Sequence, residues 1–314
     1  MSHSVLVLGG SGLLGSAVAR FLSEQAGFAV SATLRDPSLI PLVRELVPRA
    51  EWYEFDALDK DAGRRLDDLA GRHAWIVNAI GVIKQRISDQ DPEQVVRAMR
   101  VDSLLPRALH RATASRDTRV LQIATDCVYS GSRGGYTEAA PHDAGDVYGQ
   151  TKSLGEVLSP QIHHLRCSIV GLEPRSPVSL LGWFLTQPRG ACIRGFTNHH
   201  WNGLTSLHFA KLVAAIIQGN VVLGHMQHVV PRDVVTKYEL LRIFAACFDR
   251  PDVDIEPAET TVGVERSLST ERPQKNVDLW RVAGYSPPPS IREMVREFAD
   301  WPLCRALATR TGAA

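Results

Sequence analysis

The chain has 314 residues, enough for one large domain or two, and its 44% hydrophobic and 22% charged residues are typical of a globular protein. The formal net charge of +1 indicates no bulk attraction to nucleic acid or to membranes. Five cysteines, odd in number and without a C-x-x-C pair, favour reduced thiols in the cytoplasm over a disulfide framework. We expect no signal peptide and no membrane-spanning helix, because no apolar stretch approaches the ~20 residues that a bilayer requires.

Apolar strand-like runs alternate with helical patterns through the first half of the chain. The predicted strands span 5–8, 29–34, 51–55, 75–78, 120–124 and 165–170. Helices are predicted between them, with an apolar stripe on Leu14, Val18 and Leu22 and further periodic segments at 93–115 and 148–158. Strands that alternate with helices indicate parallel βαβ units, so we predict an α/β fold with a doubly wound parallel sheet of the Rossmann type.

After about Gly171 the pattern is less regular, and Pro and Gly are more frequent. We predict helices at 206–218, 236–248 and 290–301, a strand at 225–230, and a loop rich in Pro, Asp and Glu at 251–259. Ser290 follows three prolines and is the expected N-cap of the last helix. We therefore predict a dinucleotide-type Rossmann domain at 1–170 and a smaller α/β domain for the substrate at 171–314, with part of 205–235 left open to return to the first.

A glycine-rich loop follows the first predicted strand and opens the first helix. Residues 9–15 read GGSGLLG, which satisfies both G-x-x-G-x-x-G and, from the second glycine, G-x-G-x-x-G. Glycine allows a tight turn and a close approach of the backbone to a pyrophosphate, which then lies at the helix N-terminus. The predicted cofactor contacts in this loop are Gly9, Gly12, Leu13, Leu14 and Gly15.

The end of the second predicted strand bears on the choice between NAD and NADP. No acid stands near Thr33, where an NAD site places a carboxylate for the ribose. Arg35 follows and is suited to a 2′-phosphate, although Asp36 beside it gives the site a mixed charge. We favour NADP(H), with NAD(H) and a plain surface role for Arg35 left open.

Two further strand ends carry candidate cofactor residues. Asp56 follows the third predicted strand, where it would contact the adenine or cap a helix. Asn78 and Ala79 close the fourth strand and would lie beside the cofactor, or Asn78 would serve as a turn residue. The carboxyl ends of parallel strands form the ligand-binding edge of such sheets, which favours the cofactor roles.

Tyr148 and Lys152 lie four residues apart on one face of a predicted helix. A cation beside a phenol is expected to lower the tyrosine pKa from its usual ~10 and to let the phenol exchange a proton with a carbinol oxygen. Thr125 closes the fifth predicted strand and would polarise a substrate carbonyl beside Tyr148. Taken singly, the pair is also compatible with a solvated helix face, and Thr125 with a turn bond.

Three longer motifs connect these residues. Residues 125–131 read TDCVYSG, residues 136–138 read YTE, and residues 148–156 read YGQTKSLGE. In this order they resemble the extended short-chain dehydrogenase/reductase superfamily and, within it, the dTDP-4-dehydrorhamnose reductase family, whose members show T-D-x-V-F/Y-x-G, Y-x-E and Y-G-x-x-K-x-x-G-E. Arg272-Pro273 resembles the R-P element of the same family.

This resemblance implies a catalytic triad of Thr125, Tyr148 and Lys152. Hydride would come from NADPH, Tyr148 would protonate the resulting alkoxide, and Lys152 would also hold the nicotinamide ribose. The substrates of the family are nucleotide-linked 4-keto-6-deoxy sugars, which implies a role in surface-polysaccharide or related biosynthesis.

The sequence departs from the pattern at three places. Dehydratases of the superfamily carry an acidic pair after the threonine, whereas Asp126 is followed by Cys127, which disfavours dehydration. The rhamnose reductases usually have tyrosine in place of Cys127. Many superfamily members have asparagine where Asp102 stands, and some have a metal-binding glutamate where Ser16-Ala17 stands, so we predict no metal.

Candidate substrate contacts come from both halves of the chain. Trp201 would stack on a base or sugar or fill the core, and Asn202 would bond a phosphate. Two arginines would neutralise a diphosphate or lie on the surface. The predicted contacts are Asp126, Cys127, Trp201, Asn202, Arg266 and Arg272.

The leading hypothesis is an NADPH-dependent reductase of a nucleoside-diphosphate 4-keto-6-deoxy sugar, with a nucleotide-sugar substrate as its partner. A nucleotide-sugar epimerase or dehydrogenase is the second hypothesis. A non-catalytic regulatory or binding subunit with the same fold is the third, and a homodimer stays open as the assembly.

Overall fold

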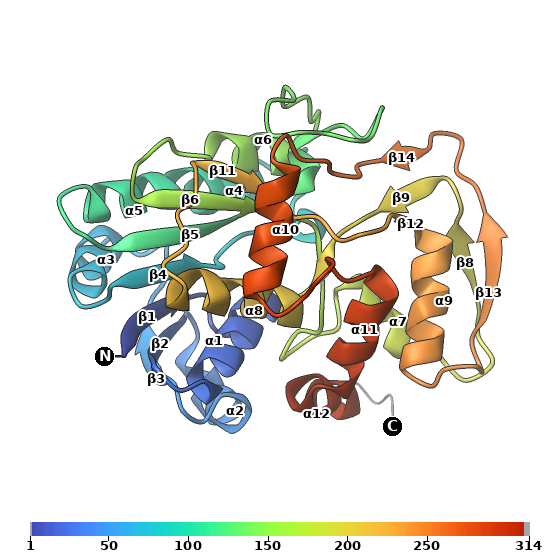
Figure 1. Ribbon diagram of the computed structural model, residues 1–314, viewed down its shortest axis with the longest axis horizontal. Helices are drawn as coiled ribbons and strands as arrows, with labels where there is room; N and C mark the ends of the chain where they lie inside the picture. The colour runs from blue at the N-terminus through green and yellow to red at the C-terminus, as the bar shows by residue number, and fades with distance from the viewer. Residues whose placement is uncertain (1, 311–314) are drawn as a thin grey trace.

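The computed structural model describes residues 2–310 and places a large parallel sheet beside a smaller mixed region (Figure 1). The elements of the first half are β1 His3–Leu8, α1 Leu13–Glu24, β2 Phe28–Leu34, α2 Ile40–Leu46, β3 Glu51–Glu54, α3 Ala62–Ala70, β4 Trp75–Asn78, α4 Pro92–Ala98, α5 Leu105–Thr113, β5 Arg119–Ala124, α6 Val147–Leu154, β6 Ile162–Arg166 and β7 Ile169–Val170.

The second half contains mostly short strands, and its helices pack around them or on the large sheet (Figure 1). Its elements are α7 Leu180–Leu185, β8 Cys192–Phe196, β9 His199–Trp201, β10 Leu204–Thr205, α8 Ser206–Gln218, β11 Met226–His228, β12 Val235–Thr236, α9 Lys237–Cys247, β13 Asp254–Ala258, β14 Val264–Glu265, α10 Pro273–Val282, α11 Ile291–Asp300 and α12 Pro302–Arg310. No helix in residues 2–310 combines the length and apolar character needed to cross a membrane.

The large sheet has seven parallel strands in the order β11-β6-β5-β4-β1-β2-β3. The inner strand β1 is buried on both faces, as its unbroken apolar run predicts. Val5 and Val7 belong to the core under α1 and α8, whereas Leu6 and Leu8 belong to the core under α3 and α5. This arrangement confirms the predicted doubly wound α/β fold with a smaller C-terminal α/β region.

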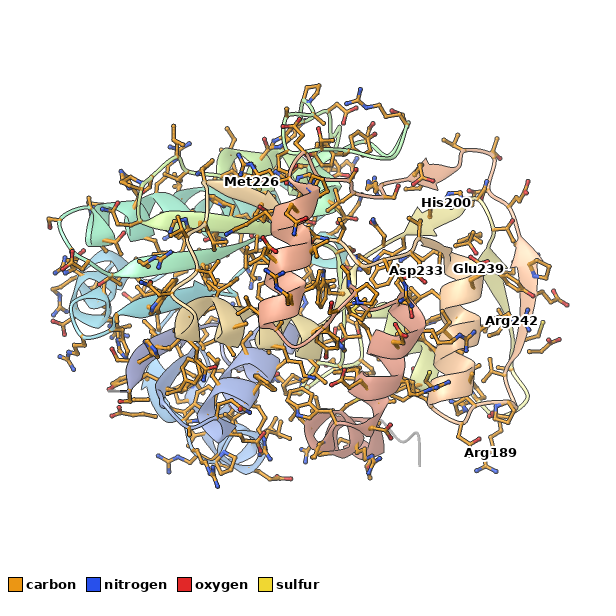
Figure 2. All side chains as sticks on the ribbon, in the orientation of Figure 1. Arg189, His200, Met226, Asp233, Glu239 and Arg242 are labelled. Atoms are coloured by element: carbon orange, nitrogen blue, oxygen red, sulfur yellow. The ribbon has the colours of Figure 1, made fainter. Side chains whose placement is uncertain are left out.

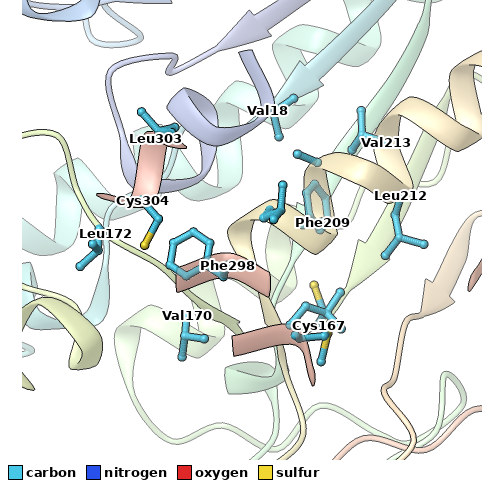
Figure 3. Close-up of a cluster of buried hydrophobic side chains, with 14 of the residues drawn as sticks. Val18, Cys167, Val170, Leu172, Phe209, Leu212, Val213, Phe298, Leu303 and Cys304 are labelled. Atoms are coloured by element: carbon cyan, nitrogen blue, oxygen red, sulfur yellow. The ribbon is translucent and has the colours of Figure 1, made fainter. Parts of the chain in front are cut away.

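Helix α8 and strand β11 lie with the first half of the chain. Helix α8 packs against α1, and β11 extends the large sheet by pairing with β6. Figure 3 shows how Val18 of α1 and Phe209 and Val213 of α8 lie near Phe298 of α11 and Leu303 of α12. One continuous hydrophobic core therefore joins the helices of the large sheet to those near the end of the chain.

A partly buried polar network adds to this junction. The His208 imidazole lies 3.0 Å from both the Glu297 carboxylate and the Tyr285 hydroxyl, and Tyr285 donates to Glu297 at 2.6 Å. Lys211 donates to Glu297 and, at 2.8 Å, to Tyr285. Burial opposes the charge on Glu297, but the donors His208, Lys211 and Tyr285 together hold its pKa below the usual range.

Several predicted elements need correction. The loop predicted at 251–259 contains strand β13, which pairs in parallel with β8. Its residues are mostly exposed and include Pro257, so local propensity favours a loop and the strand depends on its distant partner. The strand predicted at 165–170 is interrupted, because β6 ends at Arg166 and β7 begins at Ile169.

The helix predicted at 93–115 is divided by a π-helical segment, Met99–Leu104, between α4 and α5. The helix predicted at 148–158 ends at Leu154. The predicted N-cap of the closing helix is confirmed, since the Ser290 hydroxyl accepts from the backbone of Glu293 and the Glu293 carboxylate accepts from the backbone of Ser290.

Candidate active site

The glycine loop joins β1 to α1 through a close backbone contact. Gly9 has a positive φ of 80°, and its carbonyl accepts from the Gly12 backbone at 3.0 Å. A Cβ at Gly15 would lie 2.1 Å from the Gly9 carbonyl oxygen, so only glycine lets α1 approach the loop this closely. The Gly9 amide donates to the Thr33 hydroxyl at 3.0 Å, which ties the loop to the end of β2.

A cavity of about 540 Å³ opens at this loop, at the carboxyl ends of the parallel strands. The predicted cofactor residues Gly9, Gly12, Leu13, Arg35, Asp56 and Ala79 all line it. Its far side carries residues that the sequence reasoning missed, which are Arg86, Arg97, Glu173, Arg175 and Ser176. The site has the size and the backbone donors that a dinucleotide requires.

At the end of β2, the Asp36 carboxylate has both hydrogen-bond and ion-pair partners. The Asp36 carboxylate accepts from the backbone and hydroxyl of Ser38 at 3.1 and 2.6 Å, and it lies 3.5 Å from Arg175. The Ser38 hydrogen bonds hold the pKa of Asp36 below its usual range. Because Asp36 stays ionised and pairs with Arg175, the excess positive charge of these three side chains resides on Arg35.

Two predicted cofactor residues have structural contacts of their own. Asn78 is fully buried, donates to the Gln122 side chain at 2.8 Å and accepts from the Ile80 backbone at 3.2 Å. Asp56 accepts from the Leu58 backbone at 2.9 Å, as a turn residue does, although it also lines the cavity.

Thr125 lies at the carboxyl end of β5 and caps the 3₁₀ turn Asp126–Val128. Its hydroxyl oxygen accepts from the Cys127 backbone at 3.1 Å, and the hydroxyl donates to Asp126 at 3.2 Å. Beneath it, the fully buried Arg166 donates to the Thr125 carbonyl at 2.8 Å. Arg166 also donates to Glu156 at 2.8 Å, so a buried ion pair holds the backbone of the threonine in place.

Helix α6 brings Tyr148 to this turn. A Cβ at Gly149 would lie 2.3 Å from the Cys127 carbonyl oxygen, so the helix packs directly on the turn. Asp146 caps the helix by accepting from the Gly149 backbone at 2.8 Å. Tyr148 also lines a second cavity of about 280 Å³, formed with residues 84–90 and Asp146. The structure thus brings Tyr148 together with Thr125.

The electrostatics of Tyr148 differ from the prediction. Burial is the main cause that raises the pKa of the phenol above its usual range. The Asp102 carboxylate adds to the rise, and contact with the Thr125 hydroxyl opposes it only in part. The predicted lowering by Lys152 is wrong, first because burial raises the pKa of Tyr148 and second because the lysine ammonium is paired with a carboxylate. Tyr148 is therefore a neutral phenol, the form that donates a proton.

That carboxylate is Asp102, in the π-helical segment. Its Oδ1 lies 3.0 Å from the Lys152 ammonium and accepts from the Val82 backbone at 3.1 Å, while its Oδ2 has no hydrogen-bond partner among the described residues. Burial raises the pKa of Asp102, and Lys152 opposes the rise. A Cβ at Gly81 would lie 2.6 Å from the lysine nitrogen, so the backbone there leaves room for the pair.

The predicted substrate residues differ in whether they lie near the turn that follows Thr125. Trp201 is buried and its indole donates to the Ser168 hydroxyl at 2.8 Å. Arg266 donates to the carbonyls of Tyr129 and Ser130 at 2.9 and 3.1 Å, which places it against the turn that carries Asp126 and Cys127. Burial raises the pKa of the Cys127 thiol to about 12, so this side chain is a neutral neighbour.

Asn202 and Arg272 have their hydrogen-bond partners outside that turn. Both ends of the Asn202 amide are occupied by the Leu268 backbone, at 2.7 and 2.9 Å. Arg272 is exposed and reaches back to the carbonyl of Met226, the first residue of β11, at 3.1 Å (Figure 2 labels Met226). The structure does not bring Arg272 to Tyr148.

Sequence reasoning missed Lys237, the first residue of α9. Its ammonium lies 5.3 Å from the centroid of the Trp201 ring, and burial lowers its pKa to about 8. The charges that act on it come from Asp126, Cys127 and Arg266. Nothing around position 237 marks a motif, so only the fold shows that this lysine belongs to the site.

A known protein family matches the part of the chain that carries the glycine loop and Thr125. Residues 3–170, more than half of the chain, match the model of the RmlD substrate binding domain. The chain belongs to this family. The match confirms the resemblance found in the motifs, and it covers the glycine loop, the Thr125 turn and helix α6 of this RmlD-family chain. No curated protein sequence matches the chain.

Solved structures resemble the RmlD-family chain over nearly its whole length. A dTDP-4-dehydrorhamnose reductase from Clostridium acetobutylicum has 17% identity and a TM-score of 0.69, covering 95% of this chain and 98% of that one. The corresponding protein from Bacillus anthracis, solved with NADP, gives the same four values. A UDP-glucuronic acid 4-epimerase variant from Bacillus cereus, solved with NAD, has 15% identity and a TM-score of 0.74, covering 98% and 99%. These likenesses show that both regions share one fold with these enzymes.

Proposed function

We propose that the chain reduces a nucleoside-diphosphate 4-keto-6-deoxy sugar to the 4-hydroxy sugar with NADPH, and that Tyr148 is the proton donor. The observation that carries the proposal is the meeting of Thr125 and a neutral Tyr148 at the carboxyl edge of the sheet, beside the cavity of the glycine loop. The family and the neighbouring enzymes, some of them solved with NADP or NAD, support this chemistry.

The cavity suits a dinucleotide, because the close contact of Gly15 with Gly9 leaves the first backbone amides of α1 free to face a pyrophosphate. Arg35 and Arg175 would meet a ribose phosphate, which favours NADPH over NADH. When bound, the nicotinamide supplies the hydride that the substrate carbon accepts. Lys152 would bond the nicotinamide ribose from its position beside Asp102.

The residues of the chain supply the proton and the orientation. The Thr125 hydroxyl would hydrogen-bond the substrate ketone and orient it toward Tyr148. As negative charge develops on that oxygen, the Tyr148 phenol would transfer its proton to it. Arg166 acts indirectly, since its bond to the Thr125 carbonyl holds the threonine in position.

The test is NADPH oxidation by the purified full chain with dTDP- and UDP-linked 4-keto-6-deoxy sugars. Tyr148→Phe removes the proton donor and should lower kcat by about 10²- to 10⁴-fold. Tyr53→Phe, on β3 and away from the turn, is the matched control and should retain turnover. Unchanged turnover in Tyr148→Phe contradicts the proposal.

Epimerisation of a nucleotide sugar is the second candidate, and the TM-score of 0.74 with the UDP-glucuronic acid 4-epimerase favours keeping it. Such an enzyme retains oxidised cofactor through its cycle. Cofactor that stays with the protein through purification, together with interconversion of UDP-sugars without added NADPH, would support it over the reductase. Cofactor binding without turnover of any keto sugar would instead support a regulatory subunit.

A further inference from the structure

The small sheet β12-β9-β14 lines up side chains from three distant segments. Trp201 of β9 pairs with Val235 of the antiparallel strand β12. Thr236 pairs with His200, so the next two residues in this antiparallel register, Lys237 and His199, lie opposite each other. On the other side, β14 runs parallel to β9 with Glu265 beside His200, so Arg266 follows beside Trp201.

Side chains alternate between the faces of a sheet, so this register assigns them to two faces. His200 and Glu265 share one face and bond each other at 2.6 Å (Figure 2 labels His200 on β9). Lys237, Trp201 and Arg266 share the other face with His199. The position of the Lys237 ammonium over the Trp201 ring agrees with this assignment.

The face that carries Lys237 is turned toward the catalytic turn. Arg266 donates to the carbonyls of Tyr129 and Ser130, which follow Thr125 in the same segment. Lys237 interacts electrostatically with Asp126 and Cys127, the two residues after Thr125. The cations therefore lie beside the place where the substrate ketone is proposed to bind.

These cations lack sufficient counter-charge. Within residues 2–310 the Lys237 ammonium forms no ion pair or hydrogen bond, and the attraction of Asp126 for it is opposed by the repulsion of Arg266. Farther along, Lys84 and Asp146 neutralise each other at 2.6 Å. His199 adds no charge, because burial and Lys237 lower its pKa. A half-buried lysine without a counter-ion, held over an indole ring, is costly unless a ligand supplies the anion.

We propose that Lys237 and Arg266 bind an oxyanion of the substrate over Trp201, beside Thr125. The placement of the substrate rests on the proposed function. The oxyanion is a phosphate of the nucleoside diphosphate or, for the uronic acid substrate of the second candidate function, the sugar carboxylate, since both accept hydrogen bonds from ammonium and guanidinium groups.

The test measures binding to the full chain by calorimetry, with UDP, dTDP, UDP-glucose and UDP-glucuronate as probes. Lys237→Met removes the charge but keeps the length of the side chain, and it should weaken binding at least about tenfold, the loss expected for one charge-assisted contact. Lys237→Arg keeps the charge and should retain most of the affinity. Lys60→Met, at an exposed lysine, is the control and should bind as the parent does.

The probes distinguish the two sources of the oxyanion. An equal loss for all four probes assigns Lys237 to the diphosphate, whereas a loss confined to UDP-glucuronate assigns it to a sugar carboxylate. Affinities of Lys237→Met within about twofold of the parent for every probe overturn the proposal, as does a parent that binds none of them at millimolar concentration. Binding is measured without turnover, so a failed reduction assay and a failed oxyanion site are separate results.

Discussion

The cofactor edge of the large sheet and the substrate face of the small sheet are built by different means. At the cofactor edge, consecutive glycines bring backbone atoms together, with Gly15 against the Gly9 carbonyl. At the substrate face, Trp201, Lys237 and Arg266 come from three segments far apart in the chain and act through side chains. Backbone recognition therefore leaves a continuous motif in the sequence, whereas side-chain recognition depends on strand pairing.

The sharpest way to break the cofactor edge is Gly15→Ala. The added Cβ would lie 2.1 Å from the Gly9 carbonyl oxygen, so α1 must shift, and we expect a loss of about 2 kcal/mol in the free energy of unfolding and at least tenfold weaker NADPH binding. Chemical denaturation and fluorescence titration measure the two effects. Gly145→Ala is the control, because a Cβ there meets nothing within 4 Å. Equal behaviour of the two variants would show that the close contact is unimportant.

Charge at the far end of the cofactor cavity gives the next effect. Arg35→Ala and Arg175→Ala each remove a partner for the 2′-phosphate, so KM for NADPH should rise about tenfold while KM for NADH changes little. Steady-state kinetics with both cofactors measure this. Arg64→Ala, an exposed arginine on α3, should leave both KM values unchanged. A parallel rise for NADPH and NADH would contradict a role in phosphate recognition.

Asp102→Asn tests how the charges around Tyr148 set the pH dependence of the reaction. The Asp102 carboxylate is among the charges that raise the pKa of Tyr148, so its removal frees the Lys152 ammonium and lowers that pKa. Reduction requires the protonated phenol and is lost as pH rises through its pKa. The alkaline limb of the kcat profile should therefore move to lower pH in Asp102→Asn, and Asp117→Asn at an exposed site should not move it. An unmoved limb would assign Asp102 a structural role only.

The smallest effect concerns stability at the substrate face. The pKa of Lys237 is about 8 in the folded chain and near 10.5 in the unfolded one, so the unfolded state binds more protons between these values. The contribution of Lys237 to the free energy of unfolding should therefore become more favourable as pH rises from about 8 to 10.5. At pH 7, Lys237→Met should be more stable than the parent by about 1 kcal/mol. Denaturant unfolding at several pH values measures both. A destabilised Lys237→Met would mean that the lysine serves the fold and not a ligand.

The sequence by itself determined the sheet and the motifs at its edge. Strand β4 and helix α8 have the predicted bounds, because buried parallel strands and amphipathic helices leave regular apolar patterns. The glycine loop, Thr125 and Tyr148 could be identified as candidates because each lies at the end of a strand or helix that these patterns predict. The roles proposed for Thr125 and Tyr148 stay predictions.

Only the tertiary structure decided what surrounds these residues. The pairing of Lys152 with Asp102 depends on a π-helical segment packed against α6. Burial of Tyr148, with a smaller contribution from Asp102, reverses the expected shift in the pKa of the phenol. Strand β13 exists because β8 lies beside it, and Lys237 reaches the site because β12 pairs with β9. Electrostatic and cross-strand interactions join residues that are distant in sequence, so local periodicity carries no record of them.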